Sequence, residues 1–263
     1  MQLSGAHVLV TGASRGIGAR VAERAAARGA SVTVLARSAQ PLEELARRLG
    51  GRALVTDLSD PVQRQGVVGQ AETMAGRPVD VLVNAAGVDA VGSLLEIDER
   101  TMADLFQTNL LAPTELCRQV LPGMIARGAG QVVNVSSGFS TVVAAGMVPY
   151  CSSKAGLSHF TGALRQELTG TGVGTTLVEL GPVRTEMYGA IQRHRIAGPA
   201  LARLVRLHLG VEVEPDEVAR AVCEAIEHRR RHVVLPRRML PVVALTWLPR
   251  RAADLLLAGL PKR

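Results

Sequence analysis

Tyr150 and Lys154 are the two side chains of this sequence best suited to acid–base chemistry. The chain of 263 residues has only two tyrosines, and only two lysines among its 30 basic residues. Residues four apart lie on one face of a helix and can reach one reaction centre. A nearby cation lowers the pKa of a tyrosine, which is otherwise about 10. The spacing favours a tyrosine acid or base assisted by a lysine; the alternative is a buried tyrosine beside a snorkelling lysine.

Ser137 lies thirteen residues upstream of Tyr150, in the segment Val-Asn-Val-Ser-Ser-Gly. Its hydroxyl could hold a substrate oxygen beside the phenol. Lysine is a compact point charge on a flexible stem, so Lys154 could also reach a ligand hydroxyl. The stretch from Ser137 to Lys154 therefore predicts a reaction centre that the rest of the chain must position.

A glycine-rich turn, Thr-Gly-Ala-Ser-Arg-Gly-Ile-Gly at residues 11–18, follows the first apolar run. An alanine-rich helical stretch runs from it to Gly29, a natural C-cap. Strand, glycine turn and helix place backbone N–H groups against phosphate. The spacing is G-x-x-x-G-x-G, and the G-x-G-x-x-G pattern of the standard dinucleotide fold is absent. A tight turn without a ligand also needs glycines, but the strand before and the helix after favour a phosphate site.

Arg37 follows the second predicted strand, residues 31–36. A site for NAD would place an acidic residue here to bond the ribose 2′-hydroxyl, whereas an arginine accommodates a 2′-phosphate. No Asp or Glu occurs between Glu23 and Glu43. Arg15, inside the glycine turn, is a second candidate cation, although either arginine alone could be an ordinary surface charge. Together they predict NADP(H) in preference to NAD(H).

Apolar strands alternate with helical stretches along the chain. Strands that are apolar throughout imply a parallel sheet covered on both faces, and every motif above falls at the carboxyl end of a strand, where such folds bind ligands. The sequence predicts an α/β, doubly wound, Rossmann-like parallel sheet of about seven strands with helices on both faces. Pro61 is expected to open a helix. The predicted strands are residues 7–10, 31–36, 52–56, 79–83, 131–135, 175–180 and 232–235.

A single domain over residues 1–263 is expected, with its core at residues 5–236. Residues 187–209 follow the sixth strand and predict a helical lid whose apolar side chains suggest an apolar substrate. Residues 237–263 are expected to form a basic and apolar C-terminal arm.

Nothing in the chain indicates a secreted, membrane-spanning or metal-binding protein. The N-terminus lacks the regions of a signal peptide, and no apolar run reaches the roughly 18 residues of a membrane span. The cysteines, Cys117, Cys151 and Cys223, are widely spaced and predict reduced thiols in a cytoplasmic protein. The histidines show no metal-ligand spacing, so no metal is expected.

The net charge of +7 resides in the last third of the chain. From Arg184 onward there are 15 basic and 8 acidic residues, whereas the preceding part is balanced. An apolar stretch around Trp247 lies between arginine pairs, so docking on an anionic membrane surface is one interpretation. Packing on the sheet edge, the active-site mouth or a partner subunit is favoured. Nucleic-acid binding is not expected because aromatic residues for stacking are almost absent.

With these residues in view, the chain resembles the short-chain dehydrogenase/reductase family, in its single-domain type of about 250 residues. The resemblance covers roughly residues 5 to 187, and the glycine turn is similar to the family's cofactor motif. It implies that Asp57 contacts adenine and that the segment Asn84-Ala85-Ala86-Gly87 borders the cofactor.

The resemblance also bears on the catalytic residues. Asn109 matches the asparagine that completes a tetrad with Ser137, Tyr150 and Lys154, where it holds a water, through a helix carbonyl, in a proton path to the lysine. Without the resemblance, Asn109 would be a helix residue with a structural hydrogen bond. The implied catalytic residues are Asn109, Ser137, Tyr150 and Lys154.

The nicotinamide loop departs from the family in one place, because Leu180 stands where a proline usually precedes Gly181. The resemblance implies that the backbone of Val183 and the side chain of Thr185 contact the nicotinamide carboxamide or the phosphates. The implied cofactor-binding residues are Gly12, Ser14, Arg15, Gly16, Ile17, Gly18, Arg37, Asp57, Leu58, Asn84, Ala85, Gly87, Tyr150, Lys154, Val183 and Thr185.

The resemblance, with which the residue chemistry above is compatible, implies an NADP(H)-dependent oxidoreductase that interconverts a ketone and a secondary alcohol by hydride transfer, with Tyr150 as acid or base. The expected substrate is a small apolar carbonyl compound or alcohol, lipid-like or steroid-like, and a homodimer or homotetramer is expected. A 3-oxoacyl thioester on an acyl carrier protein is an alternative substrate. A cofactor-binding regulatory protein is a third possibility, against which the Tyr–Lys pair argues because binding alone does not need it.

Overall fold

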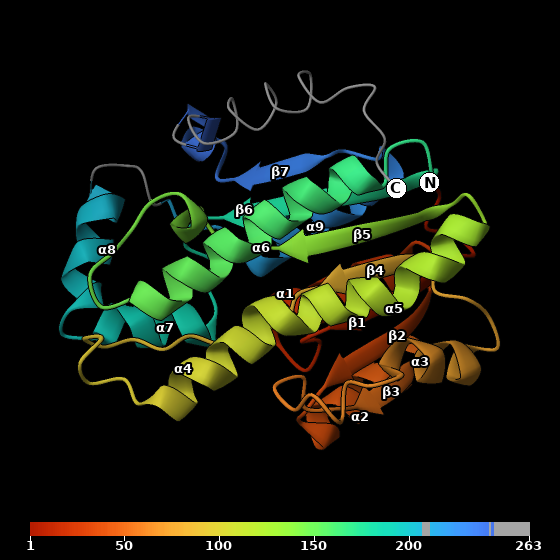
Figure 1. Cartoon of the computed structure of the whole chain (residues 1–263), viewed down its shortest axis with the longest axis horizontal. Helices are drawn as coiled ribbons and strands as arrows, with labels where there is room; N and C mark the ends of the chain where they lie inside the picture. Colours follow the sequence, from red (N-terminus) through yellow and green to blue (C-terminus); the bar gives the residue numbers. More distant parts are fainter. Residues whose placement is uncertain (207–210, 242, 245–263) are drawn as a thin grey trace.

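The chain forms one sheet between two layers of helices, shown in Figure 1 as a computed structural model. The structure describes residues 1–206, 211–241, 243 and 244. Residues 207–209 of the predicted lid, and most of the predicted C-terminal arm with Trp247, lie outside the described residues. Within the described part, no helix is both long and apolar enough to cross a membrane.

Seven parallel strands form the sheet in the order β3-β2-β1-β4-β5-β6-β7. The order reverses between β1 and β4, which is the switch point where doubly wound folds bind ligands. The predicted α/β fold is therefore confirmed, and every predicted strand matches to within two residues at either end. The strands are β1 (His7–Thr11), β2 (Ser31–Ala36), β3 (Arg52–Val55), β4 (Val81–Asn84), β5 (Gly130–Val135), β6 (Val173–Leu180) and β7 (His232–Leu235).

Helices follow the strands and return the chain to the amino end of the sheet (Figure 1). The helices are α1 (Gly16–Ala27), α2 (Ala39–Leu49), α3 (Val67–Ala75), α4 (Glu99–Phe106), α5 (Ala112–Ala126), α6 (Val148–Glu167), α7 (Glu186–Arg193), α8 (Ala197–Arg206) and α9 (Pro215–Glu227). The short turns are the π-helical η1 (Gln107–Leu111) and the 3-10 helices η2 (Gly138–Ser140) and η3 (Arg237–Met239).

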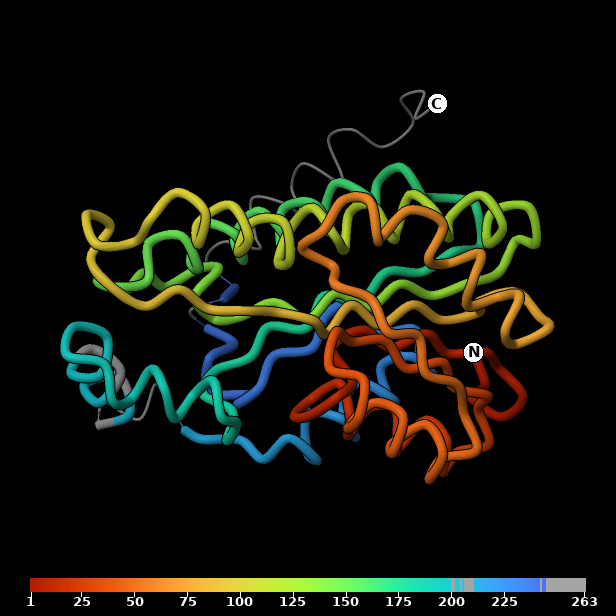
Figure 2. The backbone as a smooth tube through the Cα atoms, turned by 90° about the horizontal axis from the view of Figure 1, so that it is seen from below, coloured from red at the N-terminus to blue at the C-terminus, as the bar shows by residue number. Residues whose placement is uncertain are grey.

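Two apolar cores lie on the two faces of the sheet, and Figure 2 shows the corresponding helical layers. On one face, α1, α2 and α9 pack on the strands through residues such as Val21, Leu42 and Val222. On the other, α3, α5 and α6 pack through residues such as Val68 and Leu116. Because both faces are covered, the strands are apolar throughout, as the sequence pattern indicated. All three cysteines are buried free thiols.

The expectation that Pro61 opens a helix was wrong. Residues 61–66 form turns, and α3 begins only at Val67, after Gly66 with φ 68°. Asp60 Oδ1 accepts a hydrogen bond from the backbone N–H of Val62 at 2.8 Å, which offers the chain a local turn in place of the helical ladder. A glycine in the left-handed conformation then sets the direction of α3.

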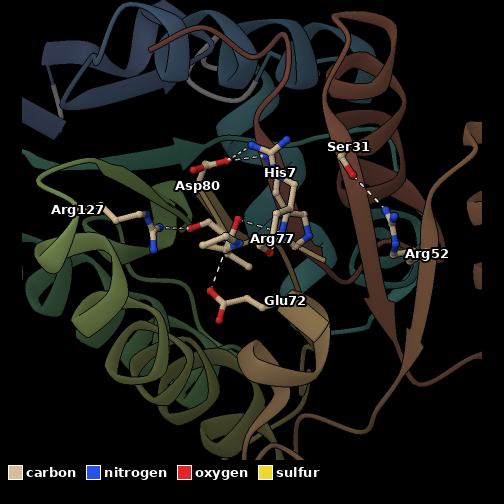
Figure 3. A network of polar contacts seen from close by, with 9 residues as sticks. His7, Ser31, Arg52, Glu72, Arg77, Asp80 and Arg127 are labelled. Carbon is tan, nitrogen blue, oxygen red and sulfur yellow. Dashed lines mark hydrogen bonds and ion pairs between the residues drawn. The ribbon is translucent and has the colours of Figure 1, made fainter. Parts of the chain in front are cut away.

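A polar network closes the amino end of the sheet, opposite the candidate site (Figure 3). The backbone N–H of His7 donates to Asp80 Oδ2 at 2.8 Å, and the His7 ring lies 2.9 Å from Thr33 Oγ1. Arg127 Nη2 donates to the carbonyl oxygen of Val79 at 3.0 Å. Burial lowers the pKa of His7, so its ring is a neutral member of this network.

Candidate active site

A cavity of about 930 Å³ runs along the carboxyl ends of the strands. Ligand pockets in proteins are usually about 300–1,000 Å³, so this one has room for an extended ligand and a second molecule. Its wall includes the glycine turn after β1, the loops after β2 to β5, and the segment from β6 into α7. The topology alone explains this gathering, because parallel strands bring all their carboxyl ends to one edge.

Most of the residues predicted from the sequence line this cavity. The two exceptions are the side chains of Asn84 and Asn109, which lie behind its wall. The predicted residues in the wall are Gly12, Ser14, Arg15, Gly16, Ile17, Gly18, Arg37, Asp57, Leu58, Ala85, Gly87, Ser137, Tyr150, Lys154, Val183 and Thr185.

The glycine turn is a cradle that only glycines can form. At Gly12, with φ 67°, a Cβ would lie 2.6 Å from Ala86 Cα, and at Gly18 it would lie 2.5 Å from the Gly12 carbonyl oxygen. No side chain caps the N-terminus of α1, and its first turn holds no acidic residue. The unpaired N–H groups there suit an anion. Thr185 Cγ2 lies 3.6 Å from where a Cβ at Gly16 would be, so the turn faces Thr185. These residues fit the phosphates of a dinucleotide.

The two candidate arginines differ in their partners. Arg15 Nη1 forms an ion pair with Glu186 Oε2 at 2.6 Å, and both side chains are about three-quarters exposed, at 74% and 75%. Such surface pairs contribute about 0–1 kcal/mol, so a phosphate can replace Glu186 at little cost. Within the described residues, Arg37 forms no ion pair, and it is exposed at the cavity rim. Arg37 is therefore the cation most available to a 2′-phosphate.

Asp57 and Asn84 are occupied by local and sheet contacts. Asp57 Oδ1 accepts from the backbone N–H and the hydroxyl of Ser59 at 2.9 and 2.7 Å, which shapes the rim after β3. The buried Asn84 donates through Nδ2 to Asn134 Oδ1 at 2.8 Å and so ties β4 to β5. The implied contact of this segment with a cofactor thus concerns Ala85 and Gly87, whereas the Asn84 side chain steadies the sheet.

Tyr150 and Lys154 lie near the start of α6, whose first turn contains Pro149, a residue suited to that position. Both side chains are buried, at 9% and 5% exposure. Lys154 Nζ donates to the carbonyl oxygen of Val135 at 3.1 Å and lies 5.9 Å from the centre of the Tyr150 ring. Ser137 lines the same cavity wall, and its hydroxyl acts to lower the pKa of Tyr150. The structure therefore brings these three predicted catalytic residues together.

Burial dominates the proton equilibria of this pair. It raises the pKa of Tyr150 to about 12, although the hydrogen bond with Ser137 acts in the opposite direction. It lowers the pKa of Lys154 to about 8. The expectation that the lysine holds the pKa of the phenol low is not met in this structure, because desolvation of the phenolate is the larger effect. At neutral pH Tyr150 therefore carries its proton and can donate it.

Asn109 lies in η1, where the helical hydrogen bonds change register. Its Oδ1 accepts from the Val88 backbone N–H at 2.9 Å, and its Nδ2 donates to the Val88 carbonyl at 2.8 Å and to Ser153 Oγ at 3.1 Å. The side chain thus clamps the loop after β4 to α6, which is the structural role considered from the sequence. A Cβ at Gly87 would lie 3.4 Å from Lys154 Nζ and 3.5 Å from Asn109 Oδ1.

Glu179, a buried carboxylate on β6 that is 2% exposed, was not predicted from the sequence. Its Oε1 accepts from Ser140 Oγ at 2.5 Å, and its Oε2 pairs with His232 Nε2 at 2.5 Å. Ser140 ends η2, the turn capped by Ser137, so Glu179 anchors the catalytic serine's turn to the sheet. A signal was present, since Glu179 is the one charge in the otherwise uncharged strand of residues 173–180.

Replacing Lys154 with methionine should stabilise the free protein at pH 7. Lowering a lysine pKa from 10.5 to about 8 corresponds to about 3 kcal/mol, at about 1.36 kcal/mol per pH unit. Below pH 8 the folded chain bears this whole cost. Between about pH 8 and 10.5 only the unfolded chain keeps the proton, so wild-type stability rises with pH and the difference closes. Urea unfolding of both proteins at pH 7 and pH 10 measures the difference in their free energies of unfolding. A difference that is equal at both pH values would contradict the lowered pKa of Lys154.

Comparison with known proteins agrees with this geometry. The family profile for short chain dehydrogenase matches residues 6–196. The chain therefore belongs to the short-chain dehydrogenase family and is an NAD(P)-dependent oxidoreductase. The family predicted from the sequence is thus confirmed.

Three relatives show where in the family the likeness lies. Ketoacyl reductase HetN of Nostoc sp. is 37% identical over 238 residues, which cover 89% of this chain and 79% of the relative. The 3-oxoacyl-(acyl-carrier-protein) reductase FabG of Vibrio cholerae is 34% identical over 224 residues, which cover 84% and 90%. A variant of actinorhodin polyketide ketoreductase solved with NADPH has a TM-score of 0.79 and 30% identity, covering 89% and 97%. This chain is similar to ketoreductases.

Proposed function

We propose that this protein is an NADPH-dependent ketoreductase that reduces the 3-oxo group of an acyl thioester to a secondary alcohol. The observation that carries the proposal is a buried Tyr150 beside Lys154 that lines, with Ser137, a cavity large enough for a dinucleotide and a substrate. A 3-oxoacyl chain combines the lipid-like ketone with the thioester that the sequence analysis kept as alternatives. The relatives named above favour the thioester.

The chain's own residues can divide the work of reduction. Ser137 and Tyr150 hold the carbonyl oxygen, and Tyr150 donates its proton to that oxygen as general acid. Lys154 then stabilises the resulting phenolate, since its ammonium lies 5.9 Å from the ring centre. Asn109 keeps the loop after β4 in place behind the lysine. When bound, the nicotinamide supplies the hydride that the protein cannot provide.

The residues that would hold the cofactor follow the wall of the cavity. The glycine turn and the N-terminus of α1 would bind the phosphates, and Arg37 with Arg15 would bind the 2′-phosphate. Asp57 would contact the adenine, and Val183 with Thr185 the nicotinamide amide. We infer NADP(H) in preference to NAD(H) from the two arginines and from the lack of an acidic residue after β2.

An apolar substrate suits the remaining walls of the cavity. Phe139 and Val142 lie on one side, Met187 and Ile191 on the lid helix α7, and Met239 after β7. Apolar walls with few polar groups orient a substrate through its one polar end. Here that end is the carbonyl oxygen beside Tyr150. A steroid-like ketone is the second candidate, on the same apolar walls.

Two broader expectations belong to this proposal. A homodimer or homotetramer is expected, as the sequence analysis proposed. The three free thiols support a cytoplasmic enzyme, because reducing compartments keep cysteines unpaired.

A panel of carbonyl compounds tests the proposed function. Short and long 3-oxoacyl thioesters, a steroid ketone and a cyclic ketone are each given with NADPH, and loss of NADPH absorbance is followed. We expect kcat/KM to be at least about tenfold higher for the 3-oxoacyl thioesters, because their apolar chain extends along the lid. A higher value for the steroid ketone would replace the proposed substrate, and no turnover with any compound would overturn the function.

A further inference from the structure

Met239 comes from the segment after β7 and reaches the catalytic centre. The side chain is 8% exposed and lies in the cavity wall with Ser137 and Tyr150. It lies against two glycines of other elements, Gly138 directly after Ser137 and Gly181 directly after β6. A Cβ at Gly138 would overlap Met239 Cε, and a Cβ at Gly181 would lie 2.8 Å from Met239 Sδ. The thioether therefore fills space that two missing side chains leave beside the catalytic serine.

The backbone holds this thioether in place. Gly181 N donates to the carbonyl oxygen of Leu235 at 2.7 Å, which extends the β6–β7 pairing to the nicotinamide loop. Met239 N donates to the Pro236 carbonyl at 3.0 Å and closes η3. The side chain also packs with Val234 and Val243. The position of Met239 is thus set by the sheet, although its terminal bonds can still rotate.

If Ser137 and Tyr150 bind the carbonyl oxygen as proposed, substrate groups next to the carbonyl would lie near Met239. Met239 lines the same cavity wall and contacts Gly138, the residue that follows Ser137. We propose that Met239 is the specificity-determining residue that restricts substrates to carbonyl compounds with an unbranched neighbouring carbon. The inference rests on the proposed ketoreductase function. We therefore expect the enzyme to prefer 3-oxoacyl thioesters without a substituent at C2 over their 2-methyl counterparts.

Met239→Ala tests this directly. The measured quantity is the ratio of kcat/KM for the 2-methyl-3-oxobutanoyl thioester of N-acetylcysteamine to that for the 3-oxobutanoyl thioester. One methyl group in an apolar pocket changes kcat/KM by about 10- to 200-fold, so we expect the ratio to rise at least about tenfold in the variant. Met74→Ala is the matched control, because Met74 is an exposed methionine on α3 outside the cavity wall, and its ratio should equal that of wild type.

A ratio for Met239→Ala within twofold of wild type, with unchanged NADPH affinity, would overturn the inference. Met239→Val removes the sulfur and its methyl but keeps apolar packing on Val234, so it serves if the alanine variant does not fold, and the ratio should rise in it too. If wild type reduces ketones but no thioester, the proposed substrate is wrong. The inference about Met239 is then tested with the ratio of kcat/KM for 2-methylcyclohexanone to that for cyclohexanone, which should rise in Met239→Ala. If wild type reduces neither class, both are overturned.

Discussion

Tyr150→Phe should lower kcat for carbonyl reduction by about 10²- to 10⁴-fold, which is the range that general acid–base catalysis contributes. The substitution keeps the buried ring, which packs edge-on against Phe139 with the ring centres 6.4 Å apart, and removes only the hydroxyl. The proton that the structure keeps on Tyr150 at neutral pH is then missing. NADPH affinity should change little, because the residues proposed to bind the phosphates and the adenine lie elsewhere in the cavity wall. Steady-state kinetics and a cofactor titration measure both quantities.

The second tyrosine of the chain is the natural control. Tyr188 also lines the cavity, but its hydroxyl donates to Glu212 Oε1 at 3.0 Å, away from Ser137. Tyr188→Phe loses one hydrogen bond of about 1 kcal/mol and should keep kcat within a few-fold of wild type. A Tyr150→Phe enzyme that retained most of its turnover would show that another group supplies the proton.

Arg37→Asp should reverse the choice of cofactor. A charge-assisted hydrogen bond is worth about 1.5–3 kcal/mol, so wild type should bind NADPH at least about tenfold more tightly than NADH. In the variant, a carboxylate repels the 2′-phosphate and offers an acceptor to the 2′-hydroxyl of NADH. Arg15 remains in the variant, but its attraction for the 2′-phosphate is opposed by the repulsion from the new carboxylate. Dissociation constants of both cofactors for both proteins measure the effect.

Arg100→Asp separates a local from a general effect of charge. Arg100 is exposed on α4 and does not line the cavity, so the same change of charge there should leave both dissociation constants within about twofold. Equal affinities of wild type for the two cofactors, or a preference for NADH, would remove the assignment of Arg37 and with it the proposed preference for NADP(H).

The sheet and the glycine turn could be predicted because their signals are local. Buried parallel strands are continuous apolar runs, so the bounds of Ser31–Ala36 and His232–Leu235 agree with the sequence prediction. The glycines at 12 and 18 mark backbone contacts too close for any other residue. Once the strands are assigned, their parallel order explains why distant motifs share one cavity.

Other features depend on contacts between residues far apart in the chain. Glu179 and His232 form a pair across two neighbouring strands. Met239 contacts Gly138, which lies about a hundred residues earlier in the sequence. No local sequence pattern predicts either contact. The raised pKa of Tyr150 could not be predicted from the sequence either, because it depends on how completely the folded chain removes the phenol from water. The prediction of a helix starting at Pro61 was wrong because the hydrogen bond from the Val62 N–H to the Asp60 side chain favours a local turn over a helix.

The fate of the cofactor's hydrogen tests the central claim most directly. Wild-type enzyme is given a 3-oxobutanoyl thioester and NADPH carrying deuterium at both C4 positions of the nicotinamide, and the product is analysed by mass spectrometry. We expect a 3-hydroxybutanoyl thioester with one deuterium, located on C3, and a hydroxyl proton that comes from water through Tyr150. A product without deuterium at C3, or no alcohol from any carbonyl compound of the panel, would contradict the assignment of this chain as a Tyr150-dependent ketoreductase.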